Sequence, residues 1–383
     1  MSPTTSPIPN TISDASPGAG PSIGPAKHEH QFLRVVLRII VGFLILCVVL
    51  ELGLRPFGYG HYTIYRPDQR LLWVPEPGRT LTVVNHLPIT INHQGLRYAV
   101  DLQAKQPDQF RVISFGDSFA QGWGVDDNSH FSAILEKKLN QGPCTKEHFQ
   151  SISGGVNAYP NSLAAEKLKQ VVEDDTLRPD VAIFAYAENS NLEKLTQLQG
   201  EDRTRFLRRV EWKSIARRSA IYNFFIEDLL RKVAYYQQRH MVMAGTLDGD
   251  AGMQNLDMNQ FNQNLADSLR ICRTHNVQMV FLMQGGEGED SNTPLHPFQK
   301  AMMDFAAREH VPMVNMIPVM SPLNQSAMFM DQVHPTVAGN EVIADELLKT
   351  VETLPNYNAV CGGNSIADGK SSQPITGAPV AAR

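Results

Sequence analysis

The sequence contains little cysteine, and that cysteine follows no metal-binding pattern. Only four cysteines occur in 383 residues, and none has a second one at the spacing of two to four residues typical of a zinc-binding pair. A disulfide scaffold and a zinc site are therefore excluded. Cys47 lies in an apolar run. Among Cys144, Cys272 and Cys361, one pair could be bridged in an oxidising compartment, and the sequence leaves open which pair.

An excess of charge of either sign is also absent. Lysine and arginine number 34 against 39 aspartates and glutamates, which gives a formal net charge of −5. The sequence has neither the basic surplus expected of a nucleic-acid-binding protein nor an acidic tail. Hydrophobic residues make up 42% and charged residues 19%, a composition typical of a globular protein with a large core.

One long apolar run stands near the N-terminus. From Phe32 to Leu54 the chain reads FLRVVLRIIVGFLILCVVLELGL, and about 20 apolar residues are enough to cross a bilayer core of about 30 Å. Arg38 and Glu51 lie toward its two ends, where long side chains can reach the membrane interface. A cleaved signal peptide would have a shorter apolar core and a small-residue cleavage site, which does not occur before Tyr59. We predict one transmembrane helix over 32–54 rather than a buried core helix.

The segments on either side of this helix, and the C-terminal segment, differ from the main domain in composition. Residues 1–31 and 356–383 are small and polar without periodicity, so we expect both to be disordered. Residues 55–110 contain many prolines and glycines, and are expected to be a linker that folds back onto the main domain. Within it, Thr80–Val84 and Ile89–Asn92 could pair as a small hairpin.

Over residues 111–355, short apolar strands alternate with helical stretches. The pattern predicts a flavodoxin-like three-layer α/β/α sandwich with a five-strand parallel sheet. In such folds ligands bind beyond the carboxyl ends of the strands. The predicted strands are Arg111–Phe115, Gln150–Ser153, Val181–Tyr186, Gln278–Met283 and Pro312–Met316.

The helical stretch over 203–240 is too long and too charged for a simple crossover helix. It could be an insertion beside the active-site face of the sheet. It could equally be a pair of amphipathic helices on the surface. The sequence alone does not decide between the two.

A serine follows the first predicted strand in the run Phe115-Gly116-Asp117-Ser118-Phe119. Gly116 permits a tight turn from strand to helix, so Ser118 would lie at the carboxyl edge of the sheet beside a helix N-terminus. There its hydroxyl faces a ligand, and nearby backbone N–H groups can stabilise an oxyanion. The alternative is that Ser118 caps the helix, because serine is favoured at that position.

A histidine and an aspartate follow the last predicted strand. In Asp331-Gln332-Val333-His334-Pro335, the spacing lets the carboxylate accept a hydrogen bond from one ring nitrogen of His334. The other nitrogen is then left to take the proton of a serine. A surface turn before a helix is the alternative. The position of this turn after a strand favours the same sheet edge as Ser118.

These two motifs, with the strand pattern between them, resemble the SGNH/GDSL hydrolases over roughly residues 90–353. The resemblance implies that Ser118 is the nucleophile, that Asp331 and His334 are its partners, and that the N–H of Ser118 belongs to an oxyanion hole. The glycine that donates the second N–H in this family corresponds to Ala158, or to Gly155 in another register. Ala158 departs from the family pattern, although a backbone N–H survives the change.

The third oxyanion donor of the family is an asparagine after the third strand. The register places it at Asn189, with Asn191 as the alternative, and Ser190 stands where the family usually has an aspartate. The run Asn92–Arg97 looks like that of membrane-attached bacterial members. A single-pass inner-membrane protein is therefore expected, with its N-terminal tail in the cytoplasm and its catalytic domain in the periplasm.

The resemblance implies a serine esterase that hydrolyses short-chain acyl esters, such as O-acetyl groups on an extracytoplasmic polysaccharide. It implies neither a metal nor an organic cofactor, and no nucleic-acid partner. An acyltransferase would share the same covalent intermediate. A non-catalytic binding subunit of a polysaccharide assembly is the third reading, supported by the departures at Ala158 and Ser190.

Two aromatic residues near Ser118 also require interpretation. Trp123 and His130 could line a sugar-binding site, or they could serve only in packing.

Overall fold

The computed structural model describes residues 26–60, 65–82, 87–144, 148–185, 190–230, 233 and 258–362. By its internal contacts the chain divides into two compact units, Met1–Leu50 and Glu51–Arg383. Most of the expected tail over 1–31 lies outside the described residues, as do the residues from 363 onward.

The apolar run forms part of helix α1, Ala26–Leu54. The segment Gln31–Phe57, which takes in most of α1 and the 3-10 turn after it, has a mean hydropathy of 2.8 and is long and apolar enough to cross a membrane. The helix begins six residues before Phe32, so the expectation of disorder is wrong for residues 26–31. A helix that is already nucleated can extend through a polar turn, because each added residue gains a hydrogen bond.

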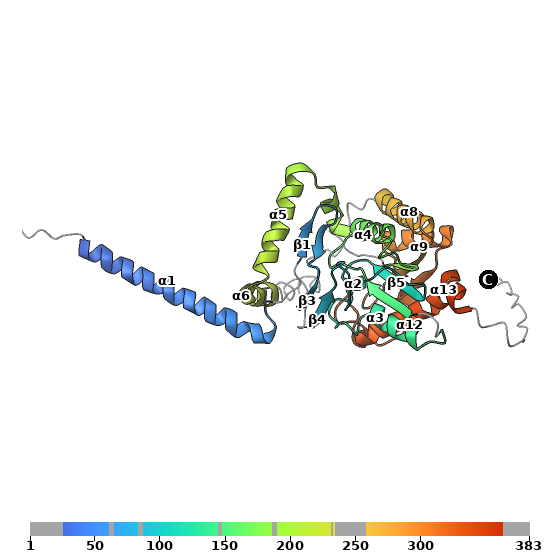
Figure 1. The fold of residues 1–383 in the computed structure, drawn as a ribbon, viewed down its shortest axis with the longest axis horizontal. Coiled ribbons are helices and arrows are strands. Elements are labelled where there is room, and N and C mark those ends of the chain that lie inside the picture. Colours follow the sequence, from blue (N-terminus) through green and yellow to red (C-terminus); the bar gives the residue numbers. More distant parts are fainter. Residues whose placement is uncertain are drawn as a thin grey trace, which may run out of the picture. The chain divides into compact units, whose positions relative to one another are not determined.

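The second unit contains the predicted five-strand parallel sheet (Figure 1). The strand order is β6-β5-β7-β8-β9, the flavodoxin-like order in which the first strand of the domain lies between the second and the third. All five residues of β7 are buried, which fits a strand covered on both faces. The strands are β5 Gln109–Phe115, β6 His148–Ser153, β7 Val181–Ala185, β8 Gln278–Met283 and β9 Met313–Asn315.

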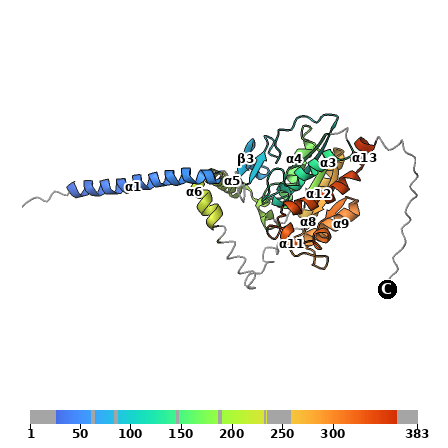
Figure 2. The ribbon, with the colours of Figure 1, turned by 90° about the horizontal axis from the view of Figure 1, so that it is seen from below.

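Helices cover both faces of this sheet, and alternate strand residues point to opposite layers. Ile113 packs in one apolar cluster and its neighbour Val112 in the other. One layer contains α4 Asn161–Glu173, α8 Met258–Thr274 and α9 Pro297–Glu309. The other layer contains α3 Phe131–Gln141, α12 Val337–Glu352 and α13 Pro355–Cys361, and α3 lies beside α12 (Figure 1, Figure 2).

Helix α13 corrects the expectation of a disordered tail over 356–383, as far as Cys361. Tyr357 is buried against Phe110 and Phe149, and Cys361 is joined to Cys144 by a disulfide. The helix has seven residues, too few for its apolar periodicity to be recognised in the sequence.

Residues 55–110 add two antiparallel hairpins to this unit. Strands β1 Tyr65–Asp68 and β2 Leu72–Pro75 form one hairpin, and β3 Arg79–Thr82 and β4 Pro88–Ile91 form the other. The second lies where a hairpin was expected. The first was not expected, because β1 contains Pro67 and Asp68, two residue types that are rare in strands.

The stretch over 203–240 is described as far as Leu230 and is not one continuous helix. Helix α5, Gly200–Ala216, packs on β1 and is followed by α6, Ala220–Tyr222, and the π-helix η4, Asn223–Leu230. The carboxylate of Glu51 accepts hydrogen bonds from the Ser219 hydroxyl and from the first N–H groups of α6. Short helices complete the second unit: η1 Arg55–Phe57, α2 Ser118–Gln121, η3 Ser190–Gln197, α10 Ile317–Met320 and α11 Gln325–Met328.

Candidate functional site

Ser118 lies three residues after the end of β5, at the first position of the short helix α2. The helix cap is Asp117, whose side chain accepts a hydrogen bond of 2.9 Å from the N–H of Phe119. The alternative that Ser118 is itself the cap is therefore wrong. With the capping role filled by its neighbour, the hydroxyl of Ser118 is available for another partner.

That partner is His334, which comes from the other end of the domain. Its Nε2 lies 2.8 Å from Oγ of Ser118, and its Nδ1 lies 2.8 Å from Oδ2 of Asp331. The sheet brings these side chains together across 216 residues because both loops emerge from the carboxyl edge. The three residues named from the sequence thus form one hydrogen-bonded chain from carboxylate to imidazole to hydroxyl.

The carboxylate of Asp331 is held in its charged form. Burial raises the pKa of this carboxyl group. The hydrogen bond and charge of His334 and the backbone N–H groups of Val333 and His334 lower the pKa by more than burial raises it, so it lies below its usual value. Both backbone N–H groups donate to Oδ1, at 3.0 and 2.8 Å. A carboxylate fixed in this way orients the imidazole.

The candidate oxyanion donors lie in two loops that run side by side. The N–H of Val156 donates to the carbonyl of Gly116, so the loop after β6 lies against the serine loop. In the described part of the chain, the N–H groups of Ser118 and Ala158 donate to no protein acceptor. Neither N–H group is therefore occupied by a residue that the structure describes. Asn189 lies outside the described residues, and Asn191 belongs to η3.

The two candidates for the second oxyanion donor, Ala158 and Gly155, differ in backbone geometry. Ala158 has a φ of 64°, in the left-handed region that glycine adopts without strain. Gly155 serves a different purpose, because a Cβ atom there would come within 2.3 Å of the N–H nitrogen of Gln121. Ala158 therefore has a backbone conformation that glycine favours, and Gly155 allows the close approach to α2.

Two residues near the serine loop have contacts that the sequence did not reveal. The ring of Trp123 lies over the imidazole of His334, with ring centroids 4.3 Å apart. The buried guanidinium of Arg97 donates to the carbonyls of Gln121, Gly122 and Val125, at 2.9, 2.6 and 2.8 Å. These bonds fix the loop that carries Trp123. No local pattern signals them, because Arg97 lies more than twenty residues before its partners.

His130, the other candidate for a sugar contact, is 4% exposed. Its Nδ1 accepts a hydrogen bond from the N–H of Ala133 at the start of α3. Burial and the charge of Arg97 lower its pKa well below the usual value, which keeps the ring neutral and able to accept. His130 thus serves in packing and capping.

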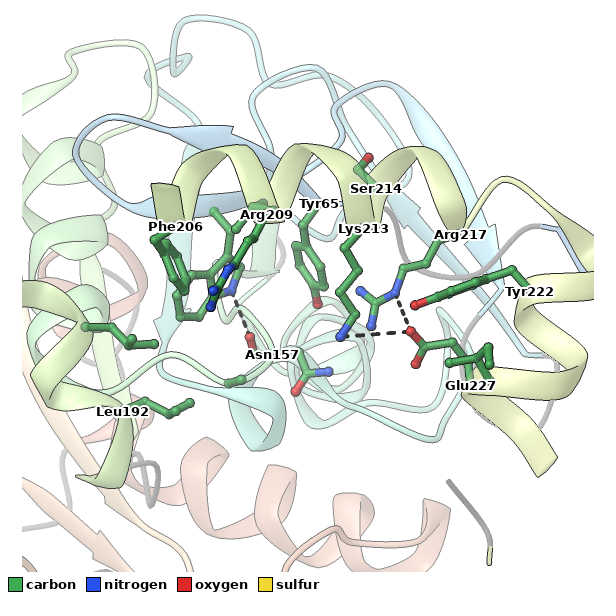
Figure 3. Close-up of a pocket in the computed structure, with 15 residues that line it drawn as sticks. Tyr65, Asn157, Leu192, Phe206, Arg209, Lys213, Ser214, Arg217, Tyr222 and Glu227 are labelled. Atoms are coloured by element: carbon green, nitrogen blue, oxygen red, sulfur yellow. Dashed lines mark hydrogen bonds and ion pairs between the residues drawn. The ribbon is translucent and has the colours of Figure 1, made fainter. Parts of the chain in front are cut away.

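A cavity of about 660 Å³ borders the loop that carries Asn157 and Ala158. The indole N–H of Trp73 on β2 donates to the carbonyl of Asn157 at 3.2 Å and holds this loop in place. Helix α5 forms the opposite wall (Figure 3). The described part of the helical stretch over 203–240 therefore lies across this cavity from the loop that carries Ala158.

The arrangement can perform acid–base and nucleophilic chemistry. It places a hydroxyl beside a basic nitrogen, a carboxylate behind that nitrogen, and two backbone N–H groups without a described acceptor in the neighbouring loops. Across the residues described, no three His, Cys, Asp or Glu side chains are grouped so that they could hold a metal ion.

Residues 114–342 match the GDSL-like lipase/acylhydrolase family. Crystal structures similar to this chain include the psychrotrophic esterase EstA from Pseudoalteromonas sp., the acetyl xylan esterase AlAXEase and the lipase/acylhydrolase from Enterococcus faecalis. Their identities are 11%, 15% and 11%, and their TM-scores are 0.38, 0.39 and 0.39. Each match covers 63% of this chain and, respectively, 96%, 100% and 95% of the other. Among curated proteins, none matches this chain.

Proposed function

Because the chain belongs to the GDSL-like lipase/acylhydrolase family, we propose that it is a serine esterase that removes short acyl groups, such as acetyl, from an extracytoplasmic polysaccharide. The observation that carries the proposal is the 2.8 Å contact between Oγ of Ser118 and Nε2 of His334. This distance allows direct transfer of the serine proton to the imidazole. The open cavity beside Ala158, lined in part by polar side chains, supports an alcohol portion rich in hydroxyl groups.

In the proposed reaction, His334 takes the proton of Ser118 while Oγ attacks the ester carbonyl. The N–H groups of Ser118 and Ala158, with the side-chain amide of Asn189, stabilise the oxyanion of the tetrahedral intermediate. His334 then gives the proton to the departing alcohol. Water, deprotonated by His334, releases the acyl group from Ser118. Throughout, Asp331 stabilises the imidazolium.

We further propose that the chain is a single-pass inner-membrane protein with its catalytic domain in the periplasm. The apolar segment Gln31–Phe57 supports a membrane anchor. The disulfide between Cys144 and Cys361 supports an oxidising compartment for the second unit, because such bonds do not persist in a reducing cytosol.

The test of the esterase is hydrolysis of p-nitrophenyl acetate by the full chain in neutral detergent. We expect Ser118→Ala to lower kcat by about 10⁴-fold or more, since the nucleophile is lost. The matched control is Ser129→Ala, a serine of the same segment outside the hydrogen-bonded chain, which should retain wild-type turnover.

Turnover that survives in Ser118→Ala would overturn the proposal. If the folded wild type gives no turnover, mass spectrometry after incubation with the ester separates the remaining readings. An acetyl group retained on Ser118 would indicate a transferase that needs its own alcohol acceptor. No acetylation at all would indicate a binding subunit.

A further inference from the structure

The indole of Trp123 contacts the imidazole of His334 on its ring face. The ring centroids are 4.3 Å apart, and the two planes are inclined by 35°. The nitrogens at the edge of the imidazole have other partners, Asp331 at Nδ1 and Ser118 at Nε2, each at 2.8 Å. The imidazole is therefore held by a carboxylate, a hydroxyl and an aromatic face, each from a different direction.

The position of the indole is fixed by packing and by a backbone hydrogen bond. Trp123 is half-buried and packs against Ile89 and Ile91 of β4, both of which are buried. Its backbone N–H donates to the carbonyl of Ser118 at 2.9 Å, so the residue is also bonded to the serine loop. The indole thus has a fixed place beside both the serine and the histidine.

The loop that carries Trp123 is held by a buried cation. The guanidinium of Arg97 is 2% exposed and donates to carbonyls on both sides of Trp123. Its Nε donates to Oδ1 of Asp127 at 3.1 Å, and the same carboxylate accepts a hydrogen bond of 3.0 Å from the N–H of Thr90 on β4. A buried charge that loses its hydrogen bonds is costly, so this arrangement resists displacement of the loop.

The same loop lies against the loop that carries His334. A Cβ atom at Gly124, the residue after Trp123, would come within 2.3 Å of Sδ of Met330. The N–H of Met330 donates to the carbonyl of His334 at 2.9 Å. The two loops therefore meet without space for a further side chain, which sets the distance between the indole and the imidazole.

The contact acts on a ring that changes charge during the proposed reaction. His334 becomes positively charged each time it takes a proton, from Ser118 or from water. A cation within about 6 Å of the centre of an aromatic ring and over its face is attracted to it, and tryptophan attracts most strongly. Because the attraction is greater for the imidazolium than for the neutral imidazole, it lowers the barrier to proton transfer.

We propose that Trp123 is a positioning residue for the reaction: it holds the imidazole of His334 in line with Ser118 and stabilises the positive charge that this ring gains. The inference rests on the proposed esterase function and names a further residue of the same site. It gives Trp123 a role in the reaction itself, beyond packing.

The test is hydrolysis of p-nitrophenyl acetate by the full chain in neutral detergent. Trp123→Leu keeps an apolar side chain against β4 but has no aromatic face, and Trp123→Phe keeps a smaller face. We expect Trp123→Leu to lower kcat by about twofold to thirtyfold, the range of a cation–π interaction, with little change in KM. Trp123→Phe should recover most of the lost kcat. The matched control is Trp212→Leu, at an exposed tryptophan of α5, which should retain the wild-type kcat.

A wild-type kcat in Trp123→Leu would overturn the inference. A change in KM alone would also overturn it, because that result would indicate a contact with the substrate. Equal losses of kcat in Trp123→Leu and Trp123→Phe would indicate packing only.

A second measurement is independent of hydrolysis. An imidazolium in contact with an indole quenches the indole fluorescence, whereas a neutral imidazole quenches it much less. The emission of Trp123, taken as the spectrum of the full chain minus that of Trp123→Phe, should therefore fall on acidification. In a His334→Gln background the same difference should not depend on pH. Asp331, Asp127 and His130 stay in place in that background, so it controls for other titrating groups.

The expected response would support the contact of Trp123 with the charged ring even if Ser118→Ala retained turnover and the esterase proposal failed. An emission that does not change with pH, or that changes equally without His334, would overturn the inference even if the esterase proposal holds.

Discussion

Ala158 occupies a conformation that its side chain disfavours. A φ of 64° costs a residue with a Cβ atom about 1–2 kcal/mol, whereas glycine adopts it freely. Because glycine loses more freedom on folding, by about 0.5–1 kcal/mol, we expect Ala158→Gly to raise the free energy of unfolding by a net 0.5–1 kcal/mol, approximately. The backbone N–H is kept, so ester hydrolysis should continue at the wild-type rate or faster. Urea denaturation measures the change in the free energy of unfolding, and p-nitrophenyl acetate turnover measures the rate of hydrolysis.

A matched control for this variant is Ala165→Gly, within helix α4, where the same change should destabilise the protein by about 1 kcal/mol. If Ala158→Gly were as destabilising as Ala165→Gly, the strain assigned to Ala158 would be wrong.

Among contacts between individual residues, those that could be predicted lie within short sequence motifs. Asp331 and His334 are three residues apart, so their contact follows from a turn, and the strand pattern puts Ser118 at the same edge. The ring contact of Trp123 with His334 and the bonds of Arg97 could not be predicted, because they depend on how distant loops pack. The roles of Ser118, Ala158 and Asn189 in the reaction stay predictions.

Helix α4 contains a charge in its buried face. Lys167 lies on the same stripe as Leu163 and Val171, and burial lowers its pKa to about 8. In the unfolded chain the lysine titrates near pH 10.5, so between these values the unfolded state binds more protons. Stability attributable to this group therefore rises with pH from about 8 to 10.5, and the cost of its charge is fully present at pH 7.

Replacing this lysine by a neutral side chain should remove that cost. We expect Lys167→Met to raise the free energy of unfolding by about 1–3 kcal/mol at pH 7, and the gain to shrink at pH 9.5, because the wild-type lysine is by then mostly neutral in the folded state. Urea titrations at the two pH values measure this gain in the free energy of unfolding. Lys169→Met controls for loss of a lysine from the same helix. A gain that is equal at both pH values would contradict the assignment.

The elements that could be predicted are those with a long, regular pattern. Strand β8 begins and ends at the predicted residues, because an apolar run marks its limits. Helix α13 could not be predicted, since it is too short for periodicity and depends on packing against distant residues. The hairpin of β1 and β2 could not be predicted because Pro67 and Asp68 are rare in strands. The interruption after α5 follows from Ser219, whose side chain caps α6.

The disulfide between Cys144 and Cys361 connects residues 217 positions apart and holds α13 against the domain. We expect Cys144→Ser to lower the free energy of unfolding by about 2–4 kcal/mol, because the unfolded chain regains freedom. Thermal unfolding with and without reductant measures the effect. The reductant should lower the Tm of the wild type and leave that of Cys144→Ser unchanged.

The remaining thiol of the second unit does not complicate this measurement. Cys272 is fully buried, and burial raises its pKa to about 12, so it does not react as a thiolate. If the wild-type chain purified from its own membranes reacted at Cys144 with a thiol reagent before reduction, the bond would be absent and the periplasmic assignment would lose its support.

The same bond closes residues 144–361 into a covalent ring. Asp331 and His334 lie inside the ring, and Ser118 lies on the arm that enters it. One cut in the backbone anywhere within the ring therefore releases no fragment, since each side of the break stays attached through the sulfur atoms. A chain nicked once by a protease would remain a single molecule, with its histidine still connected to its serine, and only reduction would separate the two parts.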